Sequence, residues 1–131
     1  HAGTAAGALA WLEAGHLQTE LGRLEAAAES FGHARDEAGG SAIAAIVAMR
    51  LGNLAEGRGA ADTAAEAYEQ AASIDSYPLR ADALAAAARC WAEAGNASKA
   101  LSTYQRLESE FADEAIAPQV VSLISELRAA Q

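Results

Sequence analysis

Residues 81–111 read ADALAAAARCWAEAGNASKALSTYQRLESEF, and this stretch decides the fold. In its second half, apolar residues recur at the i, i+4, i+7 and i+11 spacing of one face of an α-helix: Ala100, Tyr104, Leu107 and Phe111. The first half carries a matching face: Leu84, Ala87, Ala88 and Trp91. Between the two halves, Gly95 suits the left-handed backbone at a helix C-terminus, and Asn96 suits the N-cap of the next helix. The stretch therefore predicts a helical hairpin, which needs neighbours because two helices alone cannot bury both faces.

Two earlier stretches repeat this pattern. Its hinge glycines are 37 and 36 residues apart: Gly22, Gly59 and Gly95. Five residues after each glycine stands an alanine: Ala27, Ala64 and Ala100. Nine residues after each stands an aromatic residue: Phe31, Tyr68 and Tyr104. Seven residues before each stands a small residue: Gly15, Gly52 and Ala88. Repetition at this period predicts a row of stacked hairpins, in which small residues allow close approach and rings fill the space between hairpins.

The repeated series resembles the tetratricopeptide repeat, a helical hairpin of about 34 residues with a small residue in its first helix and an alanine–aromatic–alanine series in its second. The first copy carries this series and the family's tryptophan: Trp11, Gly15, Gly22, Ala27, Phe31 and Ala34. The second copy adds Ala71 to the series and has Pro78 close to the family's terminal proline. The resemblance implies a single all-α domain, a right-handed α-solenoid with hairpins at about residues 5–38, 42–75 and 79–112. A capping helix at about residues 115–130 brings the expected total to about seven helices.

Several residues mark the expected helix boundaries. Thr4 and Ser41 are candidate N-caps, and Asp62 or Thr63 is expected to begin the second helix of the middle hairpin. Pro78 suits the first position of a helix. The last helix is expected to run from about Pro118 to Ala129 with an inward apolar stripe: Val120, Val121, Leu123, Ile124 and Leu127. Its outward residues are expected to be Ser122, Ser125, Glu126 and Arg128.

The composition of the chain limits the classes of molecule that it is expected to bind. The chain has 131 residues and a net charge of −9, with only 9 lysine and arginine residues. Nucleic acids and anionic membranes both require clustered positive charge, so neither is an expected partner. Uncharged runs such as AGGSAIAAIVAM at residues 38–49 are shorter than the ~20 apolar residues that a membrane helix needs. We therefore expect no membrane insertion by this segment, and a protein or peptide as its partner.

Catalytic and metal-binding patterns are not evident, so we expect neither an enzyme nor a bound cofactor or metal. Gly57-Arg58-Gly59 lacks the strand and the lysine of a phosphate-binding loop and is better interpreted as a helix stop. Cys90 is the only cysteine and lies mid-helix, which favours a buried, unreactive thiol. None of the three histidines has a second ligand at i+3 or i+4: His1, His16 and His33. An acidic run near the third hairpin's end is expected to be solvated: Glu108, Glu110, Asp113 and Glu114.

The resemblance implies a binding role for the first helices, which line a concave groove in that family. Groove positions in this sequence are Leu12, His16, Glu20, Ile46, Met49, Asn53, Glu56, Asp82, Arg89 and Glu93. Since Glu20, Glu56 and Glu93 would repel a carboxylate, we expect an apolar or basic segment in the groove rather than an acidic tail. The predicted function is an adaptor, scaffold or chaperone-like module that binds a peptide or partner helix. The alternative is a structural module that self-associates into a homo-oligomer, and an enzyme ranks well behind both.

A looser similarity links the chain to helical-repeat domains of bacterial envelope proteins that a single N-terminal span tethers, such as ancillary translocon subunits and cell-division coordinators. The residues behind it are Glu110-Phe111-Ala112-Asp113 and the run through Ala117-Pro118 into the last helix. The similarity favours an extracytoplasmic location slightly over a cytoplasmic one and leaves both open.

Overall fold

The structure, a computed structural model, describes residues 3–112 and 118–130 and is all-α. Within these residues it has seven helices: α1 (Ala5–Glu20), α2 (Leu24–Ala38), α3 (Ala42–Gly57), α4 (Ala61–Ala72), α5 (Arg80–Glu93), α6 (Ala97–Glu110) and α7 (Pro118–Ala129). The first six match the predicted hairpins to within a few residues at each end. Part of the predicted linker to the last helix, including Asp113 and Glu114, lies outside the described residues.

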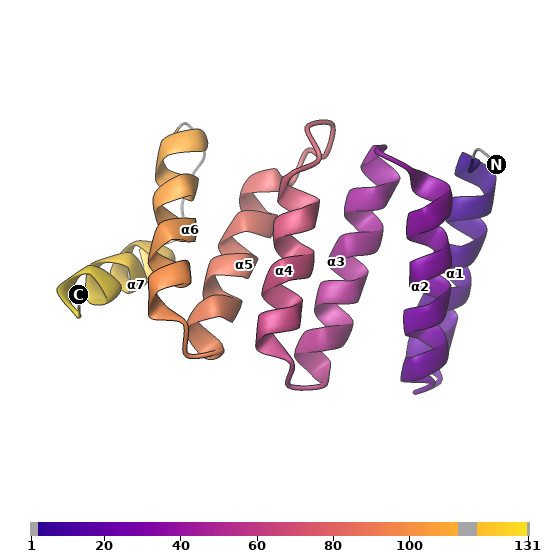
Figure 1. The fold of residues 1–131 in the computed structure, drawn as a ribbon, viewed down its shortest axis with the longest axis horizontal. Coiled ribbons are helices and arrows are strands. Elements are labelled where there is room, and N and C mark those ends of the chain that lie inside the picture. Colours follow the sequence, from indigo (N-terminus) through magenta and orange to yellow (C-terminus); the bar gives the residue numbers. More distant parts are fainter. Residues whose placement is uncertain (1–2, 113–117, 131) are drawn as a thin grey trace.

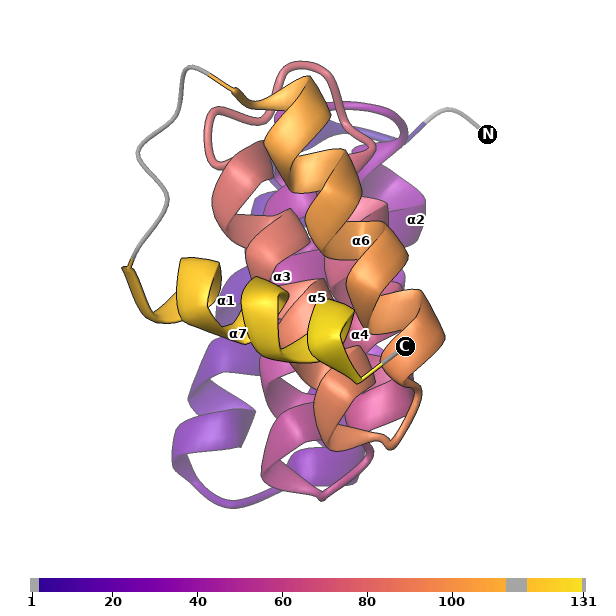
Figure 2. The same ribbon diagram turned by 90° about the vertical axis from the view of Figure 1, so that its left-hand side faces the viewer.

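Each helix from α1 to α6 packs against the next, so that the hairpins follow one another along the long axis of the molecule (Figure 1). Viewed from the end in Figure 2, α1, α3 and α5 lie on one side and α2, α4 and α6 on the other. This consecutive packing of antiparallel helices is that expected of an α-solenoid. The row of α1, α3 and α5 is called the inner row below, because it carries the predicted groove residues.

Three equivalent turns join the two helices of each hairpin. The hinge glycines have positive φ angles of 75°, 77° and 83°: Gly22, Gly59 and Gly95. In each turn the glycine N–H donates to the carbonyl three residues back, and the next N–H donates to the carbonyl five residues back: Arg23 to Gln18 at 2.8 Å, Ala60 to Ala55 at 2.9 Å and Asn96 to Trp91 at 2.9 Å. This pair of hydrogen bonds satisfies the last carbonyls of the first helix and requires a residue that accepts a left-handed backbone. The predicted hinges are confirmed.

The aromatic residues of the repeat occupy equivalent, buried places. Phe31, Tyr68 and Tyr104 are 2%, 2% and 1% exposed. A Cβ atom added to Gly15 would come within 2.4 Å of the Phe31 ring, and one added to Gly52 within 2.4 Å of the Tyr68 ring. Glycine therefore lets each ring lie directly against the first helix of its hairpin. In the third hairpin Tyr104 shares a buried cluster with Ala88, which occupies the equivalent position.

Helix α7 runs across the end of the row, over α5 and α6 (Figure 2). Ile124 is 3% exposed and shares a core cluster with Tyr104, and an ion pair of 2.6 Å joins Arg128 to Glu108 of α6. The four residues expected to face outward are exposed: Ser122, Ser125, Glu126 and Arg128. The predicted inward stripe is confirmed at Leu123, Ile124 and Leu127, which are buried or partly buried. Val121 is the exception, because it is 51% exposed. The side chain of Val120 lies outside those described.

Two predicted N-caps are confirmed by their hydrogen bonds. The Thr4 hydroxyl accepts from the N–H of Gly7 at 2.9 Å, and the Asn96 side chain accepts from the N–H of Lys99 at 3.1 Å. Each satisfies one of the N–H groups that the first turn of a helix leaves without a backbone partner.

Three helix starts differ in detail from the predictions. Ser41 occupies the N-cap position of α3 as predicted, but its hydroxyl donates to the carbonyl of Ala38 at 2.8 Å and accepts no bond from α3. Pro78 precedes the N-cap Leu79 and is not the first residue of α5. Helix α4 begins at Ala61, one residue before the expected start, because the Gly59 turn already directs the chain into the helix.

Candidate functional site

The predicted groove residues lie on the three helices of the inner row. Six of them are exposed: His16, Glu20, Asn53, Asp82, Arg89 and Glu93. Glu56 is partly buried, and so are the three apolar members, which pack against the core: Leu12, Ile46 and Met49. The surface offered by the inner row is therefore mainly polar, with apolar side chains beneath it.

A charge cluster joins α3 to α5. The Arg89 guanidinium binds both carboxylate oxygens of Glu56, with Nη1–Oε2 at 2.8 Å and Nη2–Oε1 at 2.9 Å. The same guanidinium donates to Glu93, one turn along α5, at 3.1 Å. A two-pronged arginine–carboxylate pair is among the stronger polar contacts in proteins because both hydrogen bonds are charge-assisted. Arg89 therefore partly neutralises two of the three glutamates that were expected to repel an acidic ligand.

The hydroxyl of Tyr68 reaches this cluster from α4. It lies 2.5 Å from Oε1 of Glu56 and 2.7 Å from Oδ1 of Asn53, and its one hydrogen can be donated to either oxygen. The Arg89 hydrogen bonds, helped by that of Tyr68, lower the pKa of Glu56 to about 2. Burial and the neighbouring Glu56 raise the pKa of Tyr68. The buried ring of Tyr68 thus carries a hydroxyl group that contacts polar residues of the inner row.

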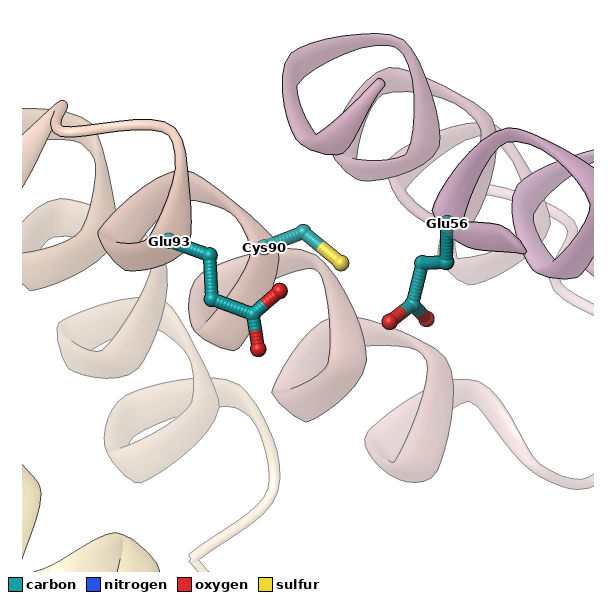
Figure 3. A group of neighbouring side chains, drawn as sticks. All are labelled: Glu56, Cys90 and Glu93. Atoms are coloured by element: carbon teal, nitrogen blue, oxygen red, sulfur yellow. The ribbon is translucent and has the colours of Figure 1, made fainter. Parts of the chain in front are cut away.

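The thiol of Cys90 lies beside the same carboxylates. Figure 3 shows Glu56 reaching from α3 toward Cys90 and Glu93 on α5, and one ligand atom from each lies within 4.8 Å of the others. Thiolate and carboxylates are metal ligands in principle. Here Arg89 already holds both carboxylates, and burial raises the pKa of the Cys90 thiol to about 11. The three donors therefore form part of an ion-paired contact between helices, and nothing in their arrangement favours a cation over Arg89.

An open pocket of about 250 Å³ lies between α1, α2 and α3. Its lining residues are His16, Thr19, Leu24, Phe31, Arg50, Asn53, Leu54 and Gly57. Phe31 and Leu54 are buried and form an apolar floor, while His16, Arg50 and Asn53 are exposed at its rim. An apolar floor with a few polar groups around it is typical of a binding pocket.

Asn53 links the pocket to the charge cluster, since it lines the first and contacts Tyr68 in the second. Glu20 lies 3.4 Å from the pocket residue His16, whereas Asp82 forms no salt bridge within the described residues. Sequence reasoning missed Thr19 and Arg50. The repeat pattern could have indicated Thr19, because Thr19 stands as far before its hinge glycine as the predicted groove residue Glu56 stands before its own.

Protein-family models give no match to this chain, and curated proteins give none either. Across residues 3–112 and 118–130, none of the helices combines the length and the hydrophobicity needed to cross a bilayer. The case for a function therefore depends on the geometry of the inner row.

Proposed function

We propose that the chain is a non-catalytic protein–protein interaction module of the tetratricopeptide-repeat type, which binds a peptide or partner helix along the inner row. The observation that carries this proposal is the pocket beside His16 and Asn53. It is large enough for one or two apolar side chains, and it lies where successive first helices meet. Binding energy in interfaces concentrates in a few large side chains seated in such pockets.

The charges of the inner row favour an apolar or basic segment. Four carboxylates lie among the predicted groove residues: Glu20, Glu56, Asp82 and Glu93. Arg89 is occupied by two of them, and Arg50 at the pocket rim is the other arginine on this face. The net charge of the face is negative. Complementary charge raises the rate of association and disfavours partners of the same sign.

Filling the pocket tests this proposal. Gly57 lines the pocket, and a Cβ atom added there meets no atom within 4 Å, so a tryptophan at this position has room to lie over the pocket. Gly57→Trp should therefore fold normally and obstruct the anchor site. Gly32→Trp is the matched control, because Gly32 lies outside the pocket lining and has equally open surroundings.

The probe is a set of peptides selected by phage display on the unmodified chain, with affinities measured by fluorescence anisotropy. We expect selected peptides to be rich in large apolar residues and in lysine or arginine. Gly57→Trp should weaken their binding about tenfold or more, the effect of losing one buried anchor of about 1.5–3 kcal/mol. Gly32→Trp should leave binding unchanged. Enrichment of acidic peptides, or equal binding by both variants, would refute the proposal.

A further inference from the structure

The pocket and the charge cluster occupy equivalent places in the repeat. The pocket lies at the first junction, where α1, α2 and α3 meet, and the cluster lies at the second, where α3, α4 and α5 meet. Counted from the hinge glycines, three pocket residues correspond to the three members of the Arg89 ion pairs. The pocket residues are Thr19, Asn53 and Gly57, and their equivalents are in turn Glu56, Arg89 and Glu93. The same positions of the repeat therefore carry different chemistry at the two junctions.

At the second junction these positions join two successive first helices. Figure 3 shows Glu56 and Glu93 facing each other from α3 and α5, and the Arg89 guanidinium binds them at 2.8 and 3.1 Å. At the first junction the equivalents of these charged residues are a threonine, an asparagine and a glycine. No salt bridge joins α1 to α3 within the described residues, and the pocket of about 250 Å³ occupies the equivalent place.

The floor of the pocket is apolar and requires no polar partner. Phe31 stands where the second junction has Tyr68, so its ring lacks the hydroxyl that binds polar groups there. Leu54 stands in the place of Cys90. None of the described lining residues is acidic, and Arg50 at the rim would repel a second cation. A lysine or arginine of a partner would therefore lose its water here without gaining a carboxylate, which costs binding free energy.

The volume of the pocket favours a large ring. An engineered apolar cavity of about 150 Å³ in another protein binds benzene, so about 250 Å³ gives room for a larger aromatic side chain. A leucine or valine would leave part of this volume empty, and unfilled apolar volume costs free energy. Tyrosine and tryptophan also carry a polar group, which suits a pocket with an apolar floor and with His16 and Asn53 at its rim. Arg50 at the same rim can lie over the face of the ring.

We propose that this pocket selects a tryptophan or tyrosine side chain as the anchor of the bound segment. This role of the pocket rests on the proposed function, because it names the side chain that the same pocket receives. The module then has one aromatic anchor site, since the Arg89 ion pairs occupy the equivalent place at the second junction. Basic residues of the partner pair instead with carboxylates that do not line the pocket, such as Glu20 and Asp82.

Two amino-acid derivatives serve as probes of the pocket: N-acetyl-tryptophanamide and N-acetyl-leucinamide. Each is titrated at millimolar concentrations into the whole isotope-labelled chain and followed by nuclear magnetic resonance. The amide signals of Leu24 and Leu54 report binding, because both residues line the pocket. We expect the tryptophan derivative to shift these signals and to bind about tenfold more tightly than the leucine derivative.

A variant that copies the second junction into the first provides the structural test. Thr19→Glu, Asn53→Arg and Gly57→Glu together recreate the ion-paired set of the second junction, and this triple variant should lose the signal shifts. Gly32→Trp should keep the full response, since Gly32 lies outside the pocket lining. Circular dichroism establishes whether the triple variant is folded. If it is not, Gly57→Trp takes its place with the same expected loss.

Equal binding of the two derivatives would overturn the proposal, and so would signals that shift equally in the triple variant. The peptides selected on the unmodified chain separate this proposal from the proposed function. If Gly57→Trp weakens their binding but exchanging their aromatic residues for leucine does not, the aromatic anchor is wrong and the binding function stands. If Gly57→Trp leaves their binding unchanged, the binding function itself is wrong.

Discussion

The close contact between Gly52 and the Tyr68 ring makes Gly52→Ala a test of the packing that the repeat depends on. The new Cβ atom would lie 2.4 Å from Cε1, 2.7 Å from Cδ1 and 2.8 Å from Cζ of Tyr68. Ordinary van der Waals contact lies at 3.4–4 Å, so the ring or the helix must move by about 1 Å. The ring is 2% exposed and its hydroxyl is held by Asn53 and Glu56, which limits its movement.

Two effects of opposite sign determine how much Gly52→Ala changes the free energy of unfolding. Replacing glycine by alanine in a helix interior stabilises a helix by about 1 kcal/mol. Overpacking a well-packed core costs about 1–3 kcal/mol. We therefore expect Gly52→Ala to lower the free energy of unfolding by about 1 kcal/mol. Gly15→Ala should cost less, because the Phe31 ring has no hydroxyl to hold it in place.

Urea unfolding followed by circular dichroism at 222 nm measures these differences. Gly32→Ala is the matched control, since Gly32 lies within α2 and a Cβ atom there meets no atom within 4 Å. It should raise the free energy of unfolding by up to about 1 kcal/mol. The free energies of unfolding of Gly52→Ala and Gly32→Ala should thus differ by about 2 kcal/mol. Equal stabilisation by both would refute the inference that the ring lies against Gly52.

Three further outcomes follow from the charge cluster and the buried thiol. The pKa of Glu56 is lowered from 4.5 to about 2, so its ion pair stabilises the fold above about pH 4.5 and this contribution is lost as the pH falls toward 2. The difference in melting temperature between the wild type and Glu56→Gln should therefore shrink over that range, and a difference that stays constant would contradict this role of the ion pair. Tyr68→Phe should lower the free energy of unfolding by about 1 kcal/mol in urea titrations, and Tyr104→Phe by less, because the Tyr104 hydroxyl makes no hydrogen bond within the described residues. Cys90, buried and with its pKa raised to about 11, should resist alkylation by iodoacetamide at pH 8 until urea unfolds the chain; rapid labelling of the native chain would contradict its placement.

Much of the fold could be predicted because the repeated positions reflect backbone requirements. The φ angles of Gly22, Gly59 and Gly95 are positive in the same turn three times, and glycine meets this requirement at the least cost. Ser41 and Pro78 occur in linkers that the repeat does not duplicate. Local preference alone places Ser41 at the N-cap of α3, but it does not indicate that the Ser41 hydroxyl donates to Ala38 or that α5 begins two residues after Pro78.

The candidate site was less predictable. The sequence placed Asn53, Glu56, Arg89 and Glu93 on one side of the inner row, but it did not indicate that Arg89 binds both glutamates. That contact joins residues 33 positions apart and depends on side-chain rotamers and on the distance between α3 and α5. The pocket depends on how side chains of α1, α2 and α3 pack around it, and a sequence pattern does not record that packing.

The Arg89 contact has a consequence for mechanics. One guanidinium holds carboxylates on two successive first helices, α3 and α5, and so links the second hairpin to the third. A ligand with a hydrogen-bond acceptor for Arg89 would displace Glu56 and so weaken the contact between the second and third hairpins. A single side chain would then determine how firmly α3 and α5 are held together.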